Sequence, residues 1–212
     1  PYKVFTPYYK KGCLGAQEPR YPKTKKLDLA KIKKIQKEGF DDLIKKLDLV
    51  QDKKWQEDIY KFVDSGESYA RDKLKEFIAN GVKNYKKGRD MPSEKSVSRL
   101  SAHLHFGEIS PNQVWHAICE LNQDTNTENF LSEIGWREFS YYLLYHFPSL
   151  PEENLRKKFD NFPWKNKQDN LTAWQKGKTG YPIIDAGMRQ LYKTGYMHNR
   201  IRMVCASFLT KN

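Results

Sequence analysis

Residues 180–203 carry the signals for two successive helices with a sharp stop between them. Pro182 fits the first turn of a helix, where its missing N–H costs nothing. Apolar residues follow it at helical spacing, namely Ile183, Ile184, Met188, Leu191 and Tyr192. A Thr-Gly pair at 194–195 is a typical helix stop, and a second helix is expected to begin at about Asn199. A chain with this pattern must turn sharply between two helices.

Two arginines, Arg200 and Arg202, fall in the first turns of the second of these helices. Positive charge is unfavourable there, because the helix dipole is itself positive at the N-terminus. We therefore expect a negative group beside the arginines. A phosphate is the preferred candidate, because guanidinium groups bind phosphate in a forked geometry.

Helical signals extend upstream as far as Ser65, a plausible N-cap. The stripe after it contains Ala70, Leu74, Phe77 and Ile78 and ends at an Asn-Gly pair at 80–81. Further helices are expected at 98–104, at 111–121, from Thr127 to just before Pro148, and at 171–176. The long one is expected to turn inward Phe130, Leu131, Ile134, Tyr141, Tyr142 and Tyr145. With no repeat and no pair of strands, the fold class is predicted to be all-α.

The first 60 residues differ in character from the rest. Four prolines among residues 1–26 predict an extended connector, and residues 27–55 mix Lys, Asp and Leu without a clean period. We therefore divide the chain into a connector at 1–60 and a helical domain at 61–212.

The net charge is +12 and the pI about 9.4, with most of the positive excess in residues 1–54. Such a balance is consistent with binding of a polyanion. The N-terminal basic residues are mostly lysines with few aromatics among them, which favours a solvated surface for that segment. The partner would then be bound elsewhere on the chain.

Three widely spaced cysteines favour a reducing compartment, so a cytoplasmic location is predicted. No run of eighteen apolar residues is present, which predicts no membrane span. His103 and His105 lack a third ligand at usable spacing, so they are expected to be structural and no metal site is predicted. A monomer is expected.

Two short motifs have the chemistry of binding sites. Glu133, Trp136 and Arg137 share one helix face by the i, i+3, i+4 rule. A carboxylate, an indole and a guanidinium suit a flipped base, although a buried Trp beside a Glu–Arg pair is the alternative. Residues 96–101 are rich in hydroxyls at a helix start and suit a phosphate, with simple N-capping by Ser98 as the alternative.

Five motifs in order resemble the FAD-binding helical domain of the DNA photolyase and cryptochrome family. They are SRLS at 98–101, GEISP at 107–111, EIGWREF at 133–139, WQKGKTG at 174–180 and the stretch 180–203. The resemblance extends over residues 66–212. The opening residues 1–7 resemble the start of the family's connector, and the chain is interpreted as a fragment of such a protein.

This resemblance implies that FAD is the cofactor. Tyr85 matches the family's flavin-contacting tyrosine. The FAD pyrophosphate would lie against Val97, Ser98, Arg99, Leu100 and Ser101, with Val97 where the family usually has Thr. Arg137, Asn199 and Arg202 complete the expected cofactor contacts. Only the phosphate side of the flavin site is expected in these 212 residues, which alone should bind FAD poorly and be inactive.

The resemblance also implies a DNA lesion site. Glu133, Trp136, Arg137, Asn199 and Met203 would surround the lesion. Arg89 and Arg200 would hold the DNA backbone. Family members that repair (6-4) lesions have His at the positions of Asn199 and Met203, so this chain is expected to act on cyclobutane dimers. Trp164 would be the outermost tryptophan of the electron-transfer chain.

The predicted function is light-dependent repair of cyclobutane pyrimidine dimers by electron transfer from reduced FAD. The partner would be DNA containing pyrimidine dimers. Trp164, Glu133 and Asn199 are the expected catalytic residues. Two alternatives stay open, a cryptochrome-type flavin photoreceptor without repair activity and a non-catalytic helical DNA-binding fragment.

Overall fold

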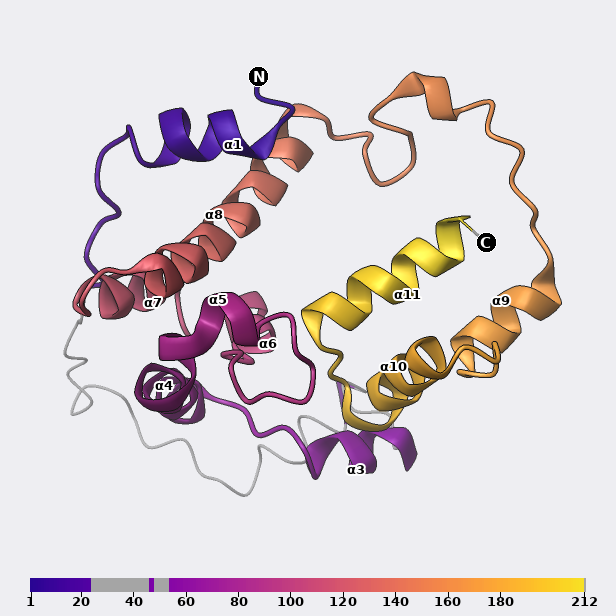
Figure 1. Cartoon of the computed structure of the whole chain (residues 1–212), viewed down its shortest axis with the longest axis horizontal. Coiled ribbons are helices and arrows are strands. Elements are labelled where there is room, and N and C mark those ends of the chain that lie inside the picture. Colours follow the sequence, from indigo (N-terminus) through magenta and orange to yellow (C-terminus); the bar gives the residue numbers. More distant parts are fainter. Residues whose placement is uncertain (24–45, 48–53, 212) are drawn as a thin grey trace.

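The computed structural model describes residues 1–23, 46–47 and 54–211. This part of the chain holds helices and no strand, as predicted for an all-α fold (Figure 1). The elements before residue 100 are α1 (Phe5–Pro7), η1 (Tyr8–Cys13), α3 (Lys54–Tyr60), α4 (Glu67–Glu76), η4 (Phe77–Gly81), η5 (Val82–Asn84) and α5 (Tyr85–Gly88). Those after it are α6 (Ser101–His105), α7 (Pro111–Cys119), α8 (Thr125–His146), η6 (Lys157–Phe159), α9 (Gln168–Gln175), α10 (Pro182–Thr194) and α11 (Asn199–Lys211).

Local signals set several of the helix ends. Pro182 is the first residue of α10, and Gly195 ends that helix in the left-handed conformation with φ 68°, both as predicted. Ser110 begins α7 through a reciprocal capping box with Gln113. Asp124 begins α8 in the same way, with Thr127 as its partner.

Three predicted starts were wrong by a few residues. Gly66, rather than Ser65, precedes α4. Thr127 lies in the first turn of α8 instead of capping it, because the Asp124 carboxylate accepts from two backbone N–H groups there. The helix predicted from residue 98 begins at Ser101, and Ser98 instead accepts a long hydrogen bond from the backbone N–H of Leu100 (3.4 Å).

One hydrophobic core joins α4, η4, η5, α5, α6, α7 and α8. Its central rings are Phe77, Tyr85 and Phe130, which pack edge-on or tilted at 4.6–5.7 Å between centroids. Leu100 and Ile109 are fully buried in the same cluster. This core holds α5 against α8, and so fixes the loop that follows α5.

A second core lies between α9, α10 and α11. It contains Ile184, Met188, Met197, Ile201 and Cys205. The indole N–H of Trp174 on α9 donates to the backbone oxygen of Cys205 at 3.1 Å. Gly187 lets α10 and α11 approach closely, since a Cβ there would overlap the Ile201 side chain. In addition, α3 packs on α10.

Residues 5–13, predicted to be extended, are helical and pack along α8. Their aromatic side chains explain the difference, because Phe5, Tyr8 and Tyr9 all bury part of their rings there. Tyr8 packs on Phe139 and Tyr142, with centroids 5.1 and 4.8 Å apart. The Tyr9 ring covers Gly135, where a Cβ would overlap it. Docking on α8 therefore overrides the proline-rich composition of the segment.

Two tyrosines of α8 do not face inward as predicted. Tyr141 is 53% exposed and Tyr145 is 82% exposed, while Phe130, Leu131 and Ile134 are buried. The core lies along the first half of α8, so the later positions of the apolar stripe extend beyond it. The linker-like segment predicted at 27–55 falls mostly outside the described residues. Where the connector ends and the domain begins stays a prediction.

None of the helices in residues 1–23, 46–47 and 54–211 is both long and apolar enough to cross a membrane.

Candidate lesion and flavin site

The loop after α5 brings α8 and α11 together through two consecutive residues, Arg89 and Asp90. Arg89 points to α8, where its Nη1 donates to Glu133 Oε1 at 2.5 Å and to Asn129 Oδ1 at 3.2 Å. Its guanidinium also lies over the Tyr85 ring, 5.3 Å from the centroid. The Arg89 side chain is only 15% exposed, so this ion pair is sheltered from water.

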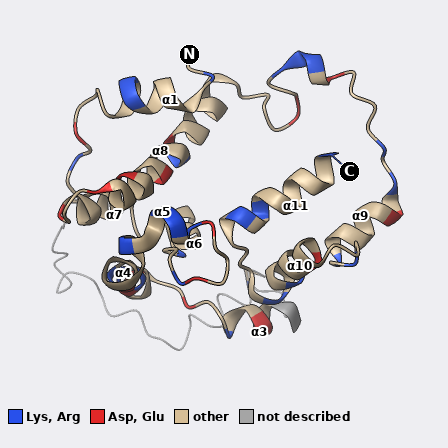
Figure 2. Ribbon diagram, viewed as in Figure 1, with Lys and Arg blue, Asp and Glu red and all other residues tan. Residues whose placement is uncertain are grey.

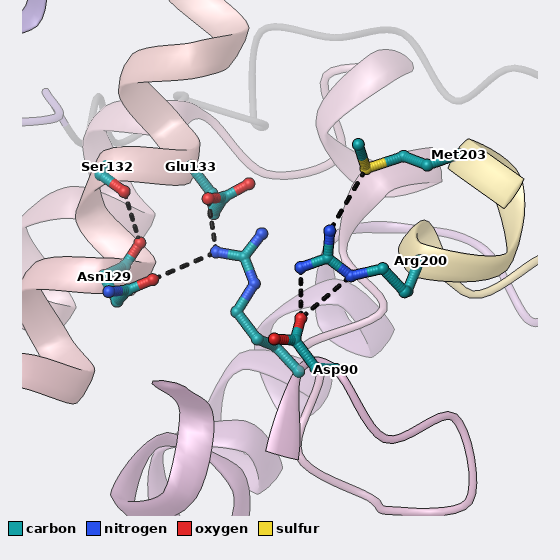
Figure 3. A network of polar contacts seen from close by, with 7 residues as sticks. Asp90, Asn129, Ser132, Glu133, Arg200 and Met203 are labelled. Atoms are coloured by element: carbon teal, nitrogen blue, oxygen red, sulfur yellow. Dashed lines mark hydrogen bonds and ion pairs between the residues drawn. The ribbon is translucent and has the colours of Figure 1, made fainter. Parts of the chain in front are cut away.

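Asp90 points the other way, to the N-terminus of α11 (Figure 3). Its Oδ1 accepts from Arg200 Nε at 3.0 Å and also from Nη2 of the same guanidinium. The third nitrogen, Nη1, lies 3.7 Å from the sulfur of Met203. The hydrogen bond from Arg200 is the main reason why the pKa of Asp90 lies below its usual range.

Asp90 supplies a negative group at the start of α11. Such a group was expected beside Arg200, and the Asp90 carboxylate lies there, while a contact between Arg200 and a phosphate stays a prediction. Figure 2 shows basic segments at α5 and at the beginning of α11. Because Asp90 lies between them, it reduces the positive charge that the two segments present together.

Arg89 was predicted to hold the DNA backbone and Glu133 to lie at the lesion, and the structure brings the two side chains into contact. Three neighbours were missed, namely Asp90, Asn129 and His198. Asn129 was detectable, because it precedes Glu133 by four positions and so shares its helix face. Asp90 lies 110 residues from Arg200, and no local signal joins them.

Residues 96–101 were predicted to bind a phosphate. The first residue of this segment, Ser96, packs against Gly88 of α5. Ser96 is buried, and a Cβ on Gly88 would overlap its side chain. Arg99 has φ 55°, the only positive φ at a non-glycine among the described residues. Such strain persists only where the surroundings hold it, and it is frequent at binding sites.

Two arginines of the predicted flavin site lie beside Tyr196, just before α11. The Arg99 guanidinium lies 4.8 Å from the Tyr196 ring centroid. Arg202 donates to the backbone oxygen of Met197 at 3.4 Å. Burial raises the pKa of Tyr196, and both arginines oppose that shift. Two exposed cations beside a helix start suit a diphosphate, so the residues present fit the phosphate side of FAD.

His198 is an unexpected feature of this region. It is 4% exposed, and its Nδ1 accepts from the backbone N–H of Arg200 at 3.2 Å. Burial, and then the charge of Arg200, hold the pKa of His198 below its usual value. The proton of this neutral ring therefore lies on Nε2, which has no partner among the described residues. A buried donor of this kind suits an acceptor from a ligand or a water molecule.

Asn199 and Met203 lie one turn apart on α11, and both are exposed. Met203 lines an open groove of about 500 Å³ between α10 and α11. The groove is lined by Tyr181, Ile183, Ile184, Arg200, Met203, Val204, Ser207 and Phe208. The surface around Met203 is therefore largely apolar, with Arg200 as its charged member.

Trp136, Arg137 and Trp164 make their contacts away from this junction. Trp136 stacks on Phe5 with centroids 3.7 Å apart. Arg137 turns away from Glu133 and instead contacts Glu138 at 3.1 Å and the Tyr141 hydroxyl at 3.3 Å. Trp164 lies in a loop, as predicted, and is 50% exposed. Tyr85 is 6% exposed and belongs to the core around Phe130.

His103 is structural, as predicted. It is buried and its Nδ1 lies 2.5 Å from a carboxylate oxygen of Glu108. Within the part of the chain that the structure describes, no group of three or more His, Cys, Asp or Glu side chains could hold a metal ion.

Comparison with known proteins identifies the helical body. Residues 130–212 match the family model described as the FAD binding domain of DNA photolyase. The whole chain aligns with the deoxyribodipyrimidine photo-lyase of Agrobacterium fabrum at 43% identity, covering 44% of that protein. It also matches 44% of a crystal structure of a bacterial class III photolyase from Agrobacterium tumefaciens, with a TM-score of 0.82 and 40% identity over the whole chain. Cryptochrome-2 of Arabidopsis thaliana is 41% identical over 69% of the chain and 26% of that protein.

The fold and the family match together define a helical domain of the FAD-binding type. The chain belongs to the DNA photolyase and cryptochrome family. It spans less than half the length of the photolyase that it matches over its whole sequence.

Proposed function

We propose that this chain is part of an enzyme that repairs cyclobutane pyrimidine dimers in DNA with light and FAD. The observation that carries the proposal is the junction at Arg89 and Asp90. It brings Glu133 of α8 and the Arg200–Met203 turn of α11 to one place. The full-length alignment with a deoxyribodipyrimidine photo-lyase supports the same function.

At this junction the protein has groups for both the base and the backbone of a flipped lesion. Arg89 occupies Oε1 of Glu133, so the second carboxylate oxygen can accept from a pyrimidine N–H. The amide of Asn199 can donate to and accept from the same base edge. Arg200, half exposed at the start of α11, can bind a phosphate. Lesion extrusion is favoured because a dimer stacks poorly in the duplex.

On the flavin side, Arg99 and Arg202 would hold the pyrophosphate beside Tyr196, with Ser98 and Ser101 as hydroxyl donors. Val97 would contribute through its backbone, and buried Leu100 anchors the segment in the core. FAD would supply the electron that opens the cyclobutane ring under light. The assigned roles of Tyr85, Arg137 and Trp164 stay predictions.

A light-dependent repair assay tests the proposal. The complete protein that contains this chain is mixed with a duplex carrying one thymine cyclobutane dimer, and the dimer is quantified after blue light and after darkness. We expect loss of the dimer in light only, and no repair of a (6-4) lesion. Repair of the (6-4) lesion instead would overturn the assignment that Asn199 and Met203 support.

The second candidate is a cryptochrome-type photoreceptor, which the similarity to cryptochrome-2 favours. A yellow protein with bound FAD that leaves the dimer intact in light would select it. A colourless protein that still binds DNA would select a non-catalytic DNA-binding role. A monomeric state and a cytoplasmic location stay predictions.

A further inference from the structure

The ion pair between Asp90 and Arg200 joins the two halves of the helical body. Asp90 follows α5, which belongs to the core around Phe130, and Arg200 begins α11, which belongs to the core around Ile201. Two nitrogens of the guanidinium donate to the same carboxylate oxygen. A phosphate oxygen would present the same kind of acceptor to the same two donors.

The neighbouring pair, Arg89 with Glu133, differs from this pair in exposure. The Arg89 and Glu133 side chains are 15% and 29% exposed, whereas Arg200 and Asp90 are 41% and 52% exposed. An exposed ion pair in water contributes little to stability, because solvent screens it and two side chains must be ordered. Replacing Asp90 by another anion on Arg200 therefore costs little free energy, while Arg89 stays paired with Glu133.

We propose that Asp90 occupies, in the DNA-free protein, the anion position on Arg200 that a DNA phosphate takes on binding. Asp90 is then a positioning residue. It holds the guanidinium at the start of α11, and it weakens binding to DNA in general because it must be displaced. This inference rests on the proposed function only through the contact between Arg200 and DNA.

Charge balance gives the expected effect of Asp90→Asn. In the unmodified protein, the negative charge of the displaced Asp90 carboxylate offsets the positive charge that Arg200 brings to the DNA. In the Asp90→Asn variant this negative charge is absent, so binding should neutralise about one more phosphate. The slope of log K against log salt concentration should then become steeper by about 0.9. Affinity should rise roughly three- to tenfold for dimer-containing and undamaged duplexes alike, since an exposed pair and one repulsive charge are removed.

Two control variants separate this effect from a general change of charge. Asp72→Asn removes a carboxylate that pairs with Lys75 on α4 and is 70% exposed, so it changes the net charge equally. It should leave the affinity and salt slope nearly unchanged, because the partner of Asp72 is a lysine of its own helix and not Arg200. Asp90→Glu keeps the carboxylate and should bind DNA like the unmodified protein. Thermal melting confirms that each variant is folded.

A double-mutant cycle distinguishes displacement from simple repulsion. If Asp90 must be displaced, Arg200→Ala should lower the affinity for DNA less in the unmodified protein than in the Asp90→Asn variant. The two losses should differ by about two- to fivefold, because that is the strength of an exposed ion pair. If Asp90 only repels DNA while it stays paired, Arg200→Ala costs as much or more in the unmodified protein, and the proposal is wrong.

The same measurements separate the two proposals. All variants are compared in the complete protein that contains this chain, by titration of dimer-containing and undamaged duplexes at several salt concentrations. If Arg200→Ala leaves binding to both duplexes unchanged, Arg200 is no DNA contact and the proposed interface fails at this residue. If Arg200→Ala weakens binding but Asp90→Asn does not strengthen it, only the role of Asp90 is overturned.

Discussion

The ring of Phe5 lies flat on the indole of Trp136, with centroids 3.7 Å apart and planes inclined by 10°. Phe5 belongs to α1, and Trp136 to the middle of α8. One face of the indole is therefore covered by the protein itself, while 45% of the Trp136 residue stays exposed. If Trp136 stacks on a flipped base, as the family resemblance implies, only its other face or its edge is available, and Phe5 supports the ring from behind.

The first prediction concerns Trp136→Ala in the complete protein. A stacked base contributes roughly 1–3 kcal/mol, so dimer affinity should fall about ten- to hundredfold. Undamaged duplex should bind almost as before, because phosphate charges supply that affinity. Titration of both duplexes at one salt concentration measures the difference. Equal losses on the two duplexes, or no loss on the dimer, would remove Trp136 from the lesion site.

A second prediction tests the support from Phe5. Phe5→Ala should leave the indole less ordered, so dimer affinity should fall by less than with Trp136→Ala. Phe5→Tyr keeps the stacked ring and serves as the matched control. Combined with Trp136→Ala, Phe5→Ala should have little further effect, because both act through one contact. Additive losses would show that α1 contributes to binding by another route.

Gly187 gives a prediction about the packing of α10 on α11. A Cβ there would overlap the Ile201 side chain and approach the Cys205 sulfur to 3.1 Å. Gly187→Ala should therefore lower the free energy of unfolding by about 1–3 kcal/mol, as overpacking does. Gly12→Ala is the control, since a Cβ at that helical position would lie 3.6 Å or more from its neighbours. It should be stabilising by about 0.5–1 kcal/mol, and chemical denaturation would show whether the two changes have opposite signs.

Asp185 gives a prediction about pH. Its carboxylate accepts from the Thr179 hydroxyl at 2.7 Å and from the backbone N–H groups of Thr179 and Gly180 at 2.8 and 3.0 Å. The Thr179 hydroxyl, and then these backbone groups, hold the pKa of Asp185 below its usual range. The folded protein thus favours the ionised form. This stabilisation is complete above the ordinary carboxyl pKa of about 3.9 and is lost as the pH falls through the lower, folded value.

Asp185→Asn should therefore destabilise the protein near neutral pH and flatten the fall in stability below about pH 4. Thr179→Ala removes one of the three donors and should give a smaller change of the same kind. Free energies of unfolding measured from pH 7 down to pH 3 test this. An unchanged acid slope in Asp185→Asn would mean that another group controls acid unfolding.

The sequence correctly predicted those structural features that depend on residues close together along the chain. Pro182 and Gly195 bound α10 as expected, because a ring without N–H and a residue tolerant of positive φ act locally. The helical form of residues 5–13 depends instead on docking along α8, which no local pattern contains. Tyr141 and Tyr145 continue the apolar stripe of α8 but extend beyond the core.

The site shows the same division. Family resemblance indicated Arg89, Glu133 and Arg200 one by one. Their partners in space depend on the tertiary fold, so the resemblance did not reveal that Asp90 would pair with Arg200. His198 was missed for a related reason. Its Nε2 is buried without a hydrogen-bond partner among the described residues, and this depends on tertiary packing, which no sequence motif indicates.

The last prediction concerns Trp164, which the resemblance assigns to electron transfer. It lies in the loop between η6 and α9, half exposed, with its ring 4.6 Å from that of Phe162. A solvent-exposed indole suits the outer end of such a chain, because its radical can be reduced from solution.

The Trp164→Phe variant of the complete protein should keep its FAD but lose most of the light-driven reduction of oxidised flavin. Absorbance of the flavin in the presence of an external reductant measures this reduction. If the flavin is first reduced chemically, repair of the dimer should proceed as in the unmodified protein. Normal photoreduction in the variant would show that electrons enter elsewhere, and a parallel loss of FAD would show that Trp164 has a structural role instead.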